Sequence, residues 1–493
     1  MSTRWSKCWR RCPGYSESVF LLACVAAPRA PDPPSIILVS LDTLRADRLG
    51  ALGNPDGLTP SLDRFAAESA VFTMAYSQSN LTTLSHASLF TSRYPSENAT
   101  GSLDRAIPEG RPTLAGVLAS YGYQTAAFVG GGGLTPALGV GVGFGIWRSP
   151  QDFGCLWHTL PEATAWLDDR DESRPFFAFI HGYDAHAPYL KPTPFGYAGL
   201  DASADSPGQM ALRTDVGRVA DGWLMPDPIP LLRAEGEFLR PRSPSGRLRV
   251  EDLAMARDSI PLTDADHELL RDVYDTGAAY ADLEFGVLMA ALDARHLLDE
   301  AVVVVVSDHG EDLGEEGLYS HCCDLHDAVT HVPILIRLPG EPRPGVVVDA
   351  PVGLIDLMPT LLDLVGAILP AGIHGRSLAP ALRGEPWTGP EAAFSQGGER
   401  MDMVSVRTRA GRLTYTGIRA TSPLLPELVS VAALDGPGFR ASPPMMEAEA
   451  MGLRSQLVDW LRTLAPAPVE RPADVPESLR ATLRTHGYWG VDP

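Results

Sequence analysis

At 493 residues, with 45% hydrophobic and 20% charged residues, the chain is long enough for one large packed domain and a smaller one. Its 61 acidic and 40 basic residues give a net charge of −21, which argues against a general nucleic-acid binder, because phosphate contacts need clustered Lys and Arg. An anionic substrate stays compatible with this charge, since a bound metal can supply local positive charge. No run of about 18 apolar residues occurs, so we expect no transmembrane helix.

The first 34 residues combine features of an export signal. Basic residues precede a short apolar run at 19–24, and the residues that end at Cys24 resemble a bacterial lipoprotein processing site. Against export stand the shortness of the apolar run and Glu17 just before it. Two interpretations follow: a protein of the periplasm or cell surface with a lipid anchor at Cys24, or a cytoplasmic protein. The Pro-rich residues 28–34 are predicted to be a linker.

Apolar runs typical of buried parallel strands alternate with helical patterns over residues 35–390. The predicted strands cover residues 35–42, 124–129, 175–181 and 301–307, and the predicted helices begin near residues 59, 113 and 263. This alternation favours the α/β class, with a large, mostly parallel sheet between helices. Within this predicted domain, residues 190–262 are rich in Pro, Gly, Ser and Arg and are predicted to form an insertion or lid.

Residues 391–493 show a different pattern. Short alternating segments at 403–407 and 412–415 are followed by a helical pattern at 448–464, and a last helix is expected over 476–488. This pattern predicts a smaller C-terminal α+β subdomain.

A run of small hydroxyl residues at 79–85 leads into an apolar-periodic segment that stops at Arg93, Tyr94 and Pro95, which predicts a helix. Ser and Thr at a helix start usually cap its free N–H groups. A hydroxyl held there also lies at the positive end of the helix dipole, where an attacked phosphate or sulfate would be stabilised. An ordinary cap and a reactive hydroxyl are therefore the two interpretations of this segment.

Acidic and imidazole side chains follow two of the predicted strands. Asp42 ends the first strand, and Asp308 and His309 follow the Val-rich one, so in one parallel sheet they would meet at one edge. Two carboxylates and an imidazole suit one divalent cation, namely Mg²⁺, Mn²⁺, Ca²⁺ or Zn²⁺. A second metal on Asp184 and His186 is an alternative. The six cysteines show neither a zinc motif nor a disulfide framework, and the Cys322-Cys323 pair has no assigned role.

Eight short motifs together resemble the sulfatase family of the alkaline phosphatase superfamily. They occur in the order of that family and extend over residues 36 to about 384. In chain order they are LDTLRAD (41–47), TPSLD (59–63), SLFTSRYP (88–95), DAHAPY (184–189), SDHGE (307–311), THVP (330–333), DLMPT (356–360) and GRSL (375–378). The resemblance implies an alkaline-phosphatase-like sandwich fold and a hydrolase of phosphoric or sulfuric esters.

The resemblance also implies roles for individual residues. Asp42, Asp308 and His309 fall on metal-ligand positions, whereas Thr43 stands where many members carry a second Asp ligand. Thr82 occupies the nucleophile position and is expected to bind the metal as well. Because it is neither Cys nor Ser, formylglycine cannot form there, and the chain resembles the Thr-nucleophile branch, whose members often act on phosphoesters.

Two cationic positions of the family are changed. His86 replaces an Arg, and His321 stands where many sulfatases have a Lys. The expected mechanism is attack by Thr82 on phosphorus or sulfur, with protonation of the leaving oxygen by His186 or His321. Arg93 is expected to orient the nucleophile loop or to pair with the anion. The remaining histidines near these motifs, His181, His326 and His331, are interpreted as structural.

The expected substrate is a small anionic ester, such as one on a glycan or a lipid head group. We expect cleavage of phosphate or phosphonate esters, including diesters, through a covalent threonyl intermediate. Three alternatives stay open: a sulfuric ester hydrolase with the same site, a phosphoglycerol- or phosphoethanolamine-type transferase, and a non-catalytic binding homologue.

Overall fold

The computed structural model describes residues 33–98, 106–186, 264–315, 319–321, 324–340, 345–397, 403–416, 439–442 and 447–465. Four predicted features lie outside these residues. They are the N-terminal signal segment with Cys24, the insertion at 190–262, the Cys322-Cys323 pair and the helix at 476–488.

Eight strands of the described chain form one sheet in the order β11-β2-β10-β7-β1-β6-β4-β5. At its centre, β1 (Ser35–Leu41) pairs in parallel with β7 (Ala301–Val306) on one side and with β6 (Phe176–Gly182) on the other. The two antiparallel pairings within this sheet are those of β10 with β2 and of β10 with β7. The other strands are β2 (Ala70–Phe72), β4 (Gln124–Phe128), β5 (Ile146–Arg148), β10 (Ile334–Arg337) and β11 (Val347–Val348).

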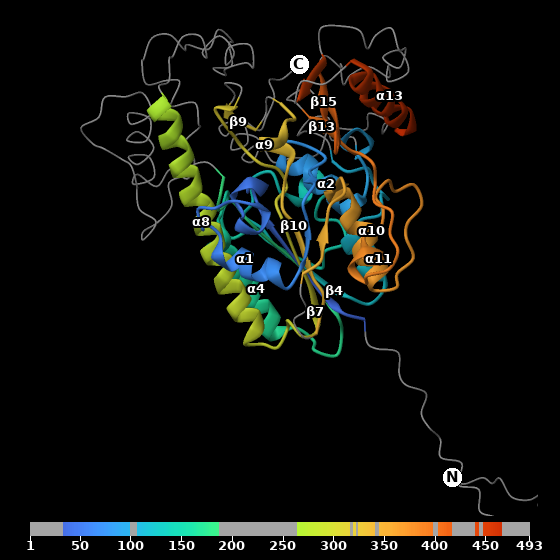
Figure 1. Cartoon of the computed structure of the whole chain (residues 1–493). Helices are drawn as coiled ribbons and strands as arrows, with labels where there is room; N and C mark the ends of the chain where they lie inside the picture. The colour runs from blue at the N-terminus through green and yellow to red at the C-terminus, as the bar shows by residue number, and fades with distance from the viewer. Residues whose placement is uncertain are drawn as a thin grey trace, which may run out of the picture. The chain divides into compact units, whose positions relative to one another are not determined.

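Helices cover both faces of this sheet (Figure 1), which explains why the central strands are almost continuous apolar runs. Successive side chains of β1 enter opposite cores: Ile37 and Val39 pack on one face, and Ile36 and Leu38 on the other. The first core contains α1 (Pro60–Ala67), α4 (Leu156–Asp169) and α8 (Asp264–Asp293). The second contains α2 (Thr82–Thr91), α3 (Leu114–Ser120) and α10 (Leu357–Leu364).

The C-terminal part forms a separate antiparallel sheet with a helix packed on it. Its strands are β13 (Ala393–Gly397), β14 (Met403–Thr408), β15 (Gly411–Thr416) and β16 (Phe439–Ser442). The helix α13 (Glu447–Thr463) buries Trp460 against this sheet, and the Tyr94 ring lies 4.8 Å from the Trp460 ring. The predicted fold class, a sandwich around a large, mostly parallel sheet plus a C-terminal α+β part, is therefore confirmed.

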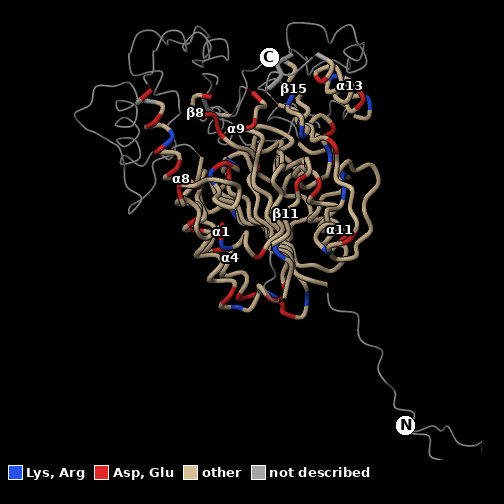
Figure 2. Tube along the Cα trace, viewed as in Figure 1, with Lys and Arg blue, Asp and Glu red and all other residues tan. Residues whose placement is uncertain are grey.

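Asp and Glu residues are distributed along the whole length of α8, and Arg271 is the one Lys or Arg residue in this helix (Figure 2). None of the helices in the described ranges combines the length with the apolar composition that a membrane span requires.

Candidate metal centre and active site

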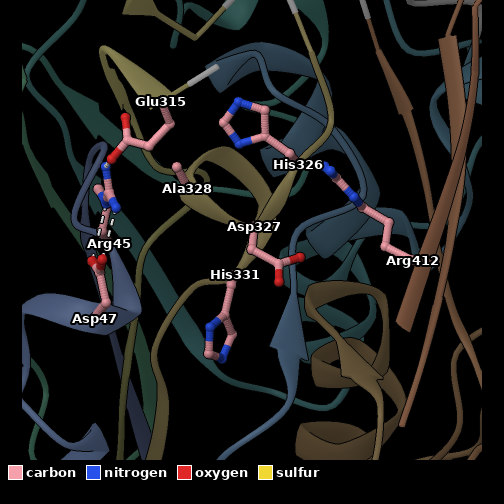
Figure 3. Close-up of a pocket in the computed structure, with 8 residues that line it drawn as sticks. All are labelled: Arg45, Asp47, Glu315, His326, Asp327, Ala328, His331 and Arg412. Carbon is pink, nitrogen blue, oxygen red and sulfur yellow. Dashed lines mark hydrogen bonds and ion pairs between the residues drawn. The ribbon is translucent and has the colours of Figure 1, made fainter. Parts of the chain in front are cut away.

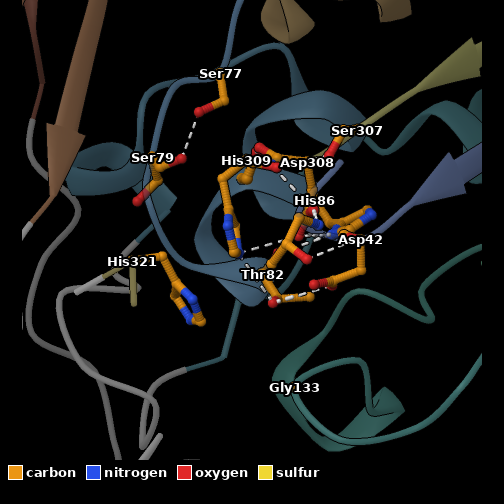
Figure 4. A network of polar contacts seen from close by, with 12 residues as sticks. Asp42, Ser77, Ser79, Thr82, His86, Gly133, Ser307, Asp308, His309 and His321 are labelled. Atoms are coloured by element: carbon orange, nitrogen blue, oxygen red, sulfur yellow. Dashed lines mark hydrogen bonds and ion pairs between the residues drawn. The ribbon is translucent and has the colours of Figure 1, made fainter. Parts of the chain in front are cut away.

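The order of the strands brings Asp42 and Asp308 together. Asp42 directly follows β1 and Asp308 lies just after the neighbouring β7, in which Val306 pairs with Ser40. Both carboxylates are fully buried at this edge of the sheet. Together with His309 they place three ligand atoms within 4.8 Å of one another. Figure 4 shows these side chains converging with Thr82.

The donor atoms of this cluster fit a divalent cation. Asp42 Oδ1 and Asp308 Oδ2 are buried and have no hydrogen-bond partner among the described residues, and such carboxylate oxygens are costly to bury without a counter-charge. The Nδ1–H of His309 donates to the Gly310 carbonyl at 2.9 Å, which leaves a lone pair on Nε2. Two oxygens and one imidazole nitrogen suit Mg²⁺, Mn²⁺, Ca²⁺ or Zn²⁺.

Thr43 stands where many members of the family carry a second Asp ligand, but its hydroxyl is directed to the backbone. Its backbone is left-handed, with φ of 57°, and its hydroxyl donates to the Asp42 carbonyl at 2.8 Å. Its N–H donates to Asp308 Oδ1 at 3.3 Å, and the His309 N–H donates to the same oxygen at 2.9 Å. Thr43 therefore orients Asp308 through its backbone.

The protonation of the cluster follows from burial and from its charges. Burial and the Asp308 carboxylate raise the pKa of Asp42 well above its usual range. Burial acts on Asp308 in the same direction, but His309, His86 and His181 outweigh it and hold the pKa of Asp308 at about 2. Burial lowers the pKa of His309, and the two carboxylates raise it above its usual value. A cation that binds here would displace protons from Asp42 and His309.

The Thr82 hydroxyl points at the cluster and does not cap its helix. Leu81 is the N-cap residue of α2, and no side chain caps that end. Thr82 Oγ1 lies 3.3 Å from Asp42 Oδ2 and 3.3 Å from His309 Nε2. It is the first residue of the helix and is fully buried, so the hydroxyl lies at the positive end of the helix dipole.

His86 lies one turn further along α2, beneath Thr82. Its Nδ1–H donates to the Thr82 carbonyl at 2.8 Å, and its Nε2 lies 3.0 Å from Ser40 Oγ. Its Nδ1 is also 3.6 Å from Asp308 Oδ2. Burial lowers the pKa of His86 to about 4, so the position where the family carries an Arg holds an imidazole that braces the first turn of the helix.

His181, which the sequence analysis interpreted as structural, also lies in this cluster. Its Nε2 is 3.2 Å from Asp42 Oδ2, because β6 pairs with β1 and Ser40 pairs with His181. Burial lowers the pKa of His181 to about 4. A polar residue at the end of a buried strand was the signal that identified Asp42 and Asp308, and the same signal could have identified His181.

His186 and His321 form the other side of the site. The ring of His321 lies 4.5 Å from that of His309 and 5.3 Å from that of His186. His321 Nδ1 is 3.0 Å from Glu311 Oε1. Of the two predicted proton donors, His321 thus lies against His309, which contacts Thr82, and His186 lies against His321. Glu311 is a residue that the sequence analysis did not assign.

Two expectations do not fit the structure. Arg93 follows the far end of α2, about 16 Å from Thr82 at the rise of an α-helix, and its guanidinium contacts the Ala371 carbonyl and Glu97. The helix length therefore separates Arg93 from the site. Among the described residues, Asp184 and His186 belong to no group of three potential metal ligands, and the Asp184 carboxylate accepts the N–H of Leu156 at the start of α4, at 2.9 and 3.2 Å.

The family model for sulfatases matches residues 34–144 and 151–367. The chain belongs to the sulfatase family. This sulfatase-family hydrolase is 26% identical over 407 residues to the ulvan-active sulfatase of Formosa agariphila, which covers 79% of this chain and 74% of that protein. It is 30% identical over 391 residues to arylsulfatase A of Homo sapiens, which covers 74% of this chain and 70% of the human one.

Solved structures share the fold of this sulfatase-family chain. The phosphonate monoester hydrolase of Silicibacter pomeroyi matches with a TM-score of 0.59 and 22% identity, over 87% of this chain and 94% of that one. A protein solved in complex with its substrate D-glucosamine-2-N,6-O-disulfate matches with a TM-score of 0.61 and 18% identity, over 88% and 98%.

A cavity of about 240 Å³ lies apart from Thr82 and is lined by charged side chains (Figure 3). Arg45 in its wall forms ion pairs with Asp47 at 2.7 Å and with Glu315 at 2.6 Å. In the same wall, His331 Nε2 donates to the Thr73 carbonyl. These contacts hold the segments after β1 and β7 in place. The lining residues are Arg45, Asp47, Glu315, His326, Asp327, Ala328, His331 and Arg412.

Proposed function

We propose that this protein hydrolyses phosphate or phosphonate esters, including diesters, with Thr82 as the nucleophile and a covalent threonyl ester as the intermediate. The observation that carries the proposal is the position of the Thr82 hydroxyl, 3.3 Å from both Asp42 Oδ2 and His309 Nε2 at the start of a buried helix. A hydroxyl at such a place is available for attack in line on an anionic ester.

The residues around Thr82 have separable tasks in this proposal. Asp42, Asp308 and His309 would hold one divalent cation, which would lower the pKa of the Thr82 hydroxyl and polarise an ester oxygen. His86 fixes the backbone of Thr82 through the Nδ1–H donated to its carbonyl. The His321 ring lies 4.5 Å from that of His309 and 5.3 Å from that of His186, and in this proposal these two imidazoles would serve the leaving oxygen.

A sulfuric ester hydrolase with the same site is the second candidate. It is favoured by the relatives at 26% and 30% identity, which are sulfatases by name. Against it stands Thr82, because the formylglycine of typical sulfatases requires Cys or Ser at this position. An ester on a glycan is the favoured natural substrate, since another relative at 24% identity is a hexuronate sulfatase. A lipid head group is the alternative.

A substrate panel tests the proposal. Aryl phosphate, bis-aryl phosphate, aryl phosphonate and aryl sulfate are assayed with and without EDTA, and glycerol is added to detect transfer in place of hydrolysis. We expect EDTA-sensitive turnover of the phosphorus esters. Turnover of the sulfate alone would favour the second candidate, and absence of turnover of all four would contradict both.

Variants of α2 test the nucleophile. Thr82→Ala should lower kcat by at least about 1,000-fold, whereas Thr82→Ser should keep measurable turnover, because it retains the hydroxyl. Ser88→Ala is the matched control: Ser88 is buried in the same helix, and its hydroxyl has no hydrogen-bond partner in the described part of the chain. Full EDTA-sensitive turnover by Thr82→Ala would refute the assignment of Thr82.

We also propose that the protein acts in the periplasm or at the cell surface, from the basic and apolar residues that precede Cys24. Mass spectrometry of the mature N-terminus tests this. A lipidated Cys24 is the expected result, and an intact N-terminus recovered from the cytoplasm would contradict it.

A further inference from the structure

Four consecutive glycines at 130–133, the glycine loop, follow β4 and have no task in the proposed function. The first three are glycine for local reasons: two of them have positive φ, of 74° and 59°, and a Cβ on the first would clash with a backbone carbonyl. Gly133 is different, because its missing Cβ would point at α2 (Figure 4). A Cβ there would lie 3.5 Å from Thr82 Cβ and 3.8 Å from Thr82 Cγ2. The backbone of Gly133 therefore lies beside the methyl group of Thr82.

Hydrogen bonds hold the glycine loop from two sides. Thr83 Oγ1 donates to the Gly133 carbonyl at 2.6 Å. On the other side, the Gly133 N–H donates to the Tyr183 hydroxyl at 3.2 Å, and this hydroxyl donates to the Gly131 carbonyl at 3.1 Å. Thr83 and Tyr183 are both buried. These contacts fix the distance between Gly133 and the first turn of α2.

The helix by itself does not select the side-chain rotamer of Thr82. Inside a helix the preceding turn restricts χ1 of threonine, but Thr82 is the first residue of α2 and has no preceding turn. Its hydroxyl lies 3.3 Å from Asp42 Oδ2 and from His309 Nε2, while its methyl group faces Gly133. Rotation of the side chain to another staggered position would turn the hydroxyl away from both partners. Contacts outside the helix therefore decide where the hydroxyl points.

We propose that the glycine loop is a wall against the Thr82 methyl group and thereby keeps the Thr82 hydroxyl directed at Asp42 and His309. Gly133 forms the wall, and Thr83 is a positioning residue that holds Gly133 in place. This inference rests on the proposed function. It also gives threonine an advantage over serine at position 82, because a serine has no methyl group for the wall to hold and populates other rotamers.

A double-mutant cycle tests the wall. Thr83→Val keeps the shape of the side chain and removes the hydrogen bond to Gly133. We expect it to lower kcat about 10-fold, with KM within about 2-fold of wild type, because the nucleophile is misplaced while the ester still binds. Thr83→Ser retains the hydroxyl and should keep most of kcat. In a Thr82→Ser background, Thr83→Val should cost less than about 3-fold, since the methyl group is absent there.

Thr91→Val is the matched control. Thr91 is buried in the same helix, and its hydroxyl donates to the Ala87 carbonyl at 2.6 Å at the end away from the site. This variant should lose as much Tm as Thr83→Val but keep kcat within about 2-fold of wild type. Tyr183→Phe loosens the loop from its other side and replaces Thr83→Val in the cycle if that variant does not fold.

A second measurement does not depend on turnover. In deuterated protein with protonated threonine methyl groups and glycines, we expect a nuclear Overhauser effect between the Thr82 methyl group and the α-hydrogens of Gly133. Loss of signals in Thr82→Ser and Gly133→Ala assigns the two groups. The effect should weaken in Thr83→Val and persist in Thr91→Val.

Three results would overturn the inference: a loss of kcat below about 3-fold in Thr83→Val, a loss above about 3-fold when the same change is made in Thr82→Ser, or a wild type without the Overhauser effect. The two proposals fail in different ways. A wild type that cleaves none of the esters contradicts the proposed function, whereas an active wild type with independent effects of Thr83→Val and Thr82→Ser contradicts the wall alone.

Discussion

Replacing Asp308 by Asn removes one charge from the metal centre and keeps the size of the side chain. The amide oxygen of Asp308→Asn can still accept the N–H groups of Thr43 and His309, which now lie 3.3 and 2.9 Å from Oδ1. What the variant loses is the anionic Oδ2, a buried oxygen without a hydrogen-bond partner in the described ranges. We therefore expect the variant to fold and to lose metal.

The magnitude follows from the spacing of the ligand atoms. Two carboxylate charges within 4.8 Å repel by about 3 kcal/mol or more at an effective dielectric of 20. In metal-free protein this repulsion is offset in part by proton uptake on Asp42 and His309, whose pKa values are raised. Metal-free Asp308→Asn should thus be at least as stable as metal-free wild type. Its metal affinity should fall by at least about 100-fold, since the loss of a supporting residue alone typically costs 10- to 100-fold.

Metal content and thermal unfolding measure the two effects separately. After dialysis against buffered Zn²⁺ or Mn²⁺, wild type should hold one ion per chain, and a concentration of 100 times Kd should stabilise it by about 2.7 kcal/mol. At the same metal concentration Asp308→Asn should be at most about half occupied and gain at most about 0.4 kcal/mol, with a correspondingly small rise in Tm. Asp363→Asn is the control, because it removes a carboxylate that pairs with Arg383 outside the site. An unchanged stoichiometry and an unchanged rise in Tm for Asp308→Asn would refute the assignment.

Three further variants test one neighbour of the metal centre, one residue that lies away from it and one buried carboxylate elsewhere in the fold. His181→Ala should weaken metal binding about 10- to 100-fold, because Nε2 of His181 lies 3.2 Å from Asp42 Oδ2 and orients this carboxylate. Calorimetry measures the affinity, and a value within about 2-fold of wild type would contradict the role of His181. Arg93→Gln should leave kcat within about 2-fold of wild type, because the Arg93 guanidinium contacts Glu97 and the Ala371 carbonyl at the far end of α2 from Thr82. A loss above about tenfold would return Arg93 to the mechanism. Burial raises the pKa of Asp356 from 3.8 to about 6, so the folded state loses stability as the pH rises from about 4 to 6. Wild type should therefore lose about 2–3 kcal/mol of unfolding free energy relative to Asp356→Asn between pH 4 and pH 7, as measured by urea unfolding. A difference between the two proteins that stays constant with pH would contradict the pKa shift.

Local pattern was sufficient for much of the fold. The Val-rich run 301–307 and the apolar run 35–42 were predicted as strands because a sheet covered on both faces buries such runs, and the structure forms strands over Ala301–Val306 and Ser35–Leu41. The α/β class followed from the alternation of these strands with helices. Asp42, Asp308 and His309 were predicted to meet because residues after parallel strands share one edge of the sheet, and the structure brings their ligand atoms within 4.8 Å.

Other features depend on which strands are neighbours and how long a helix is. His181 reaches Asp42 because β6 lies beside β1, and the order of strands is not written in either segment. Arg93 was expected to orient the nucleophile loop or to pair with the anion, but the length of α2 separates it from Thr82. Glu311 and His321 are ten residues apart and pair through the return of the chain after β7.

The sequence by itself determined four strands of the large sheet, the α/β class and the edge of the sheet at which Asp42, Asp308 and His309 lie, since these follow from apolar periodicity and from residue types within one segment. The tertiary structure decided what the Thr82 hydroxyl contacts. A free helix start would use that hydroxyl as a cap, whereas the packing of α2 against the ends of β1 and β7 turns it toward Asp42 and His309. Contacts between distant segments depend on packing, and for that reason no local pattern predicts them.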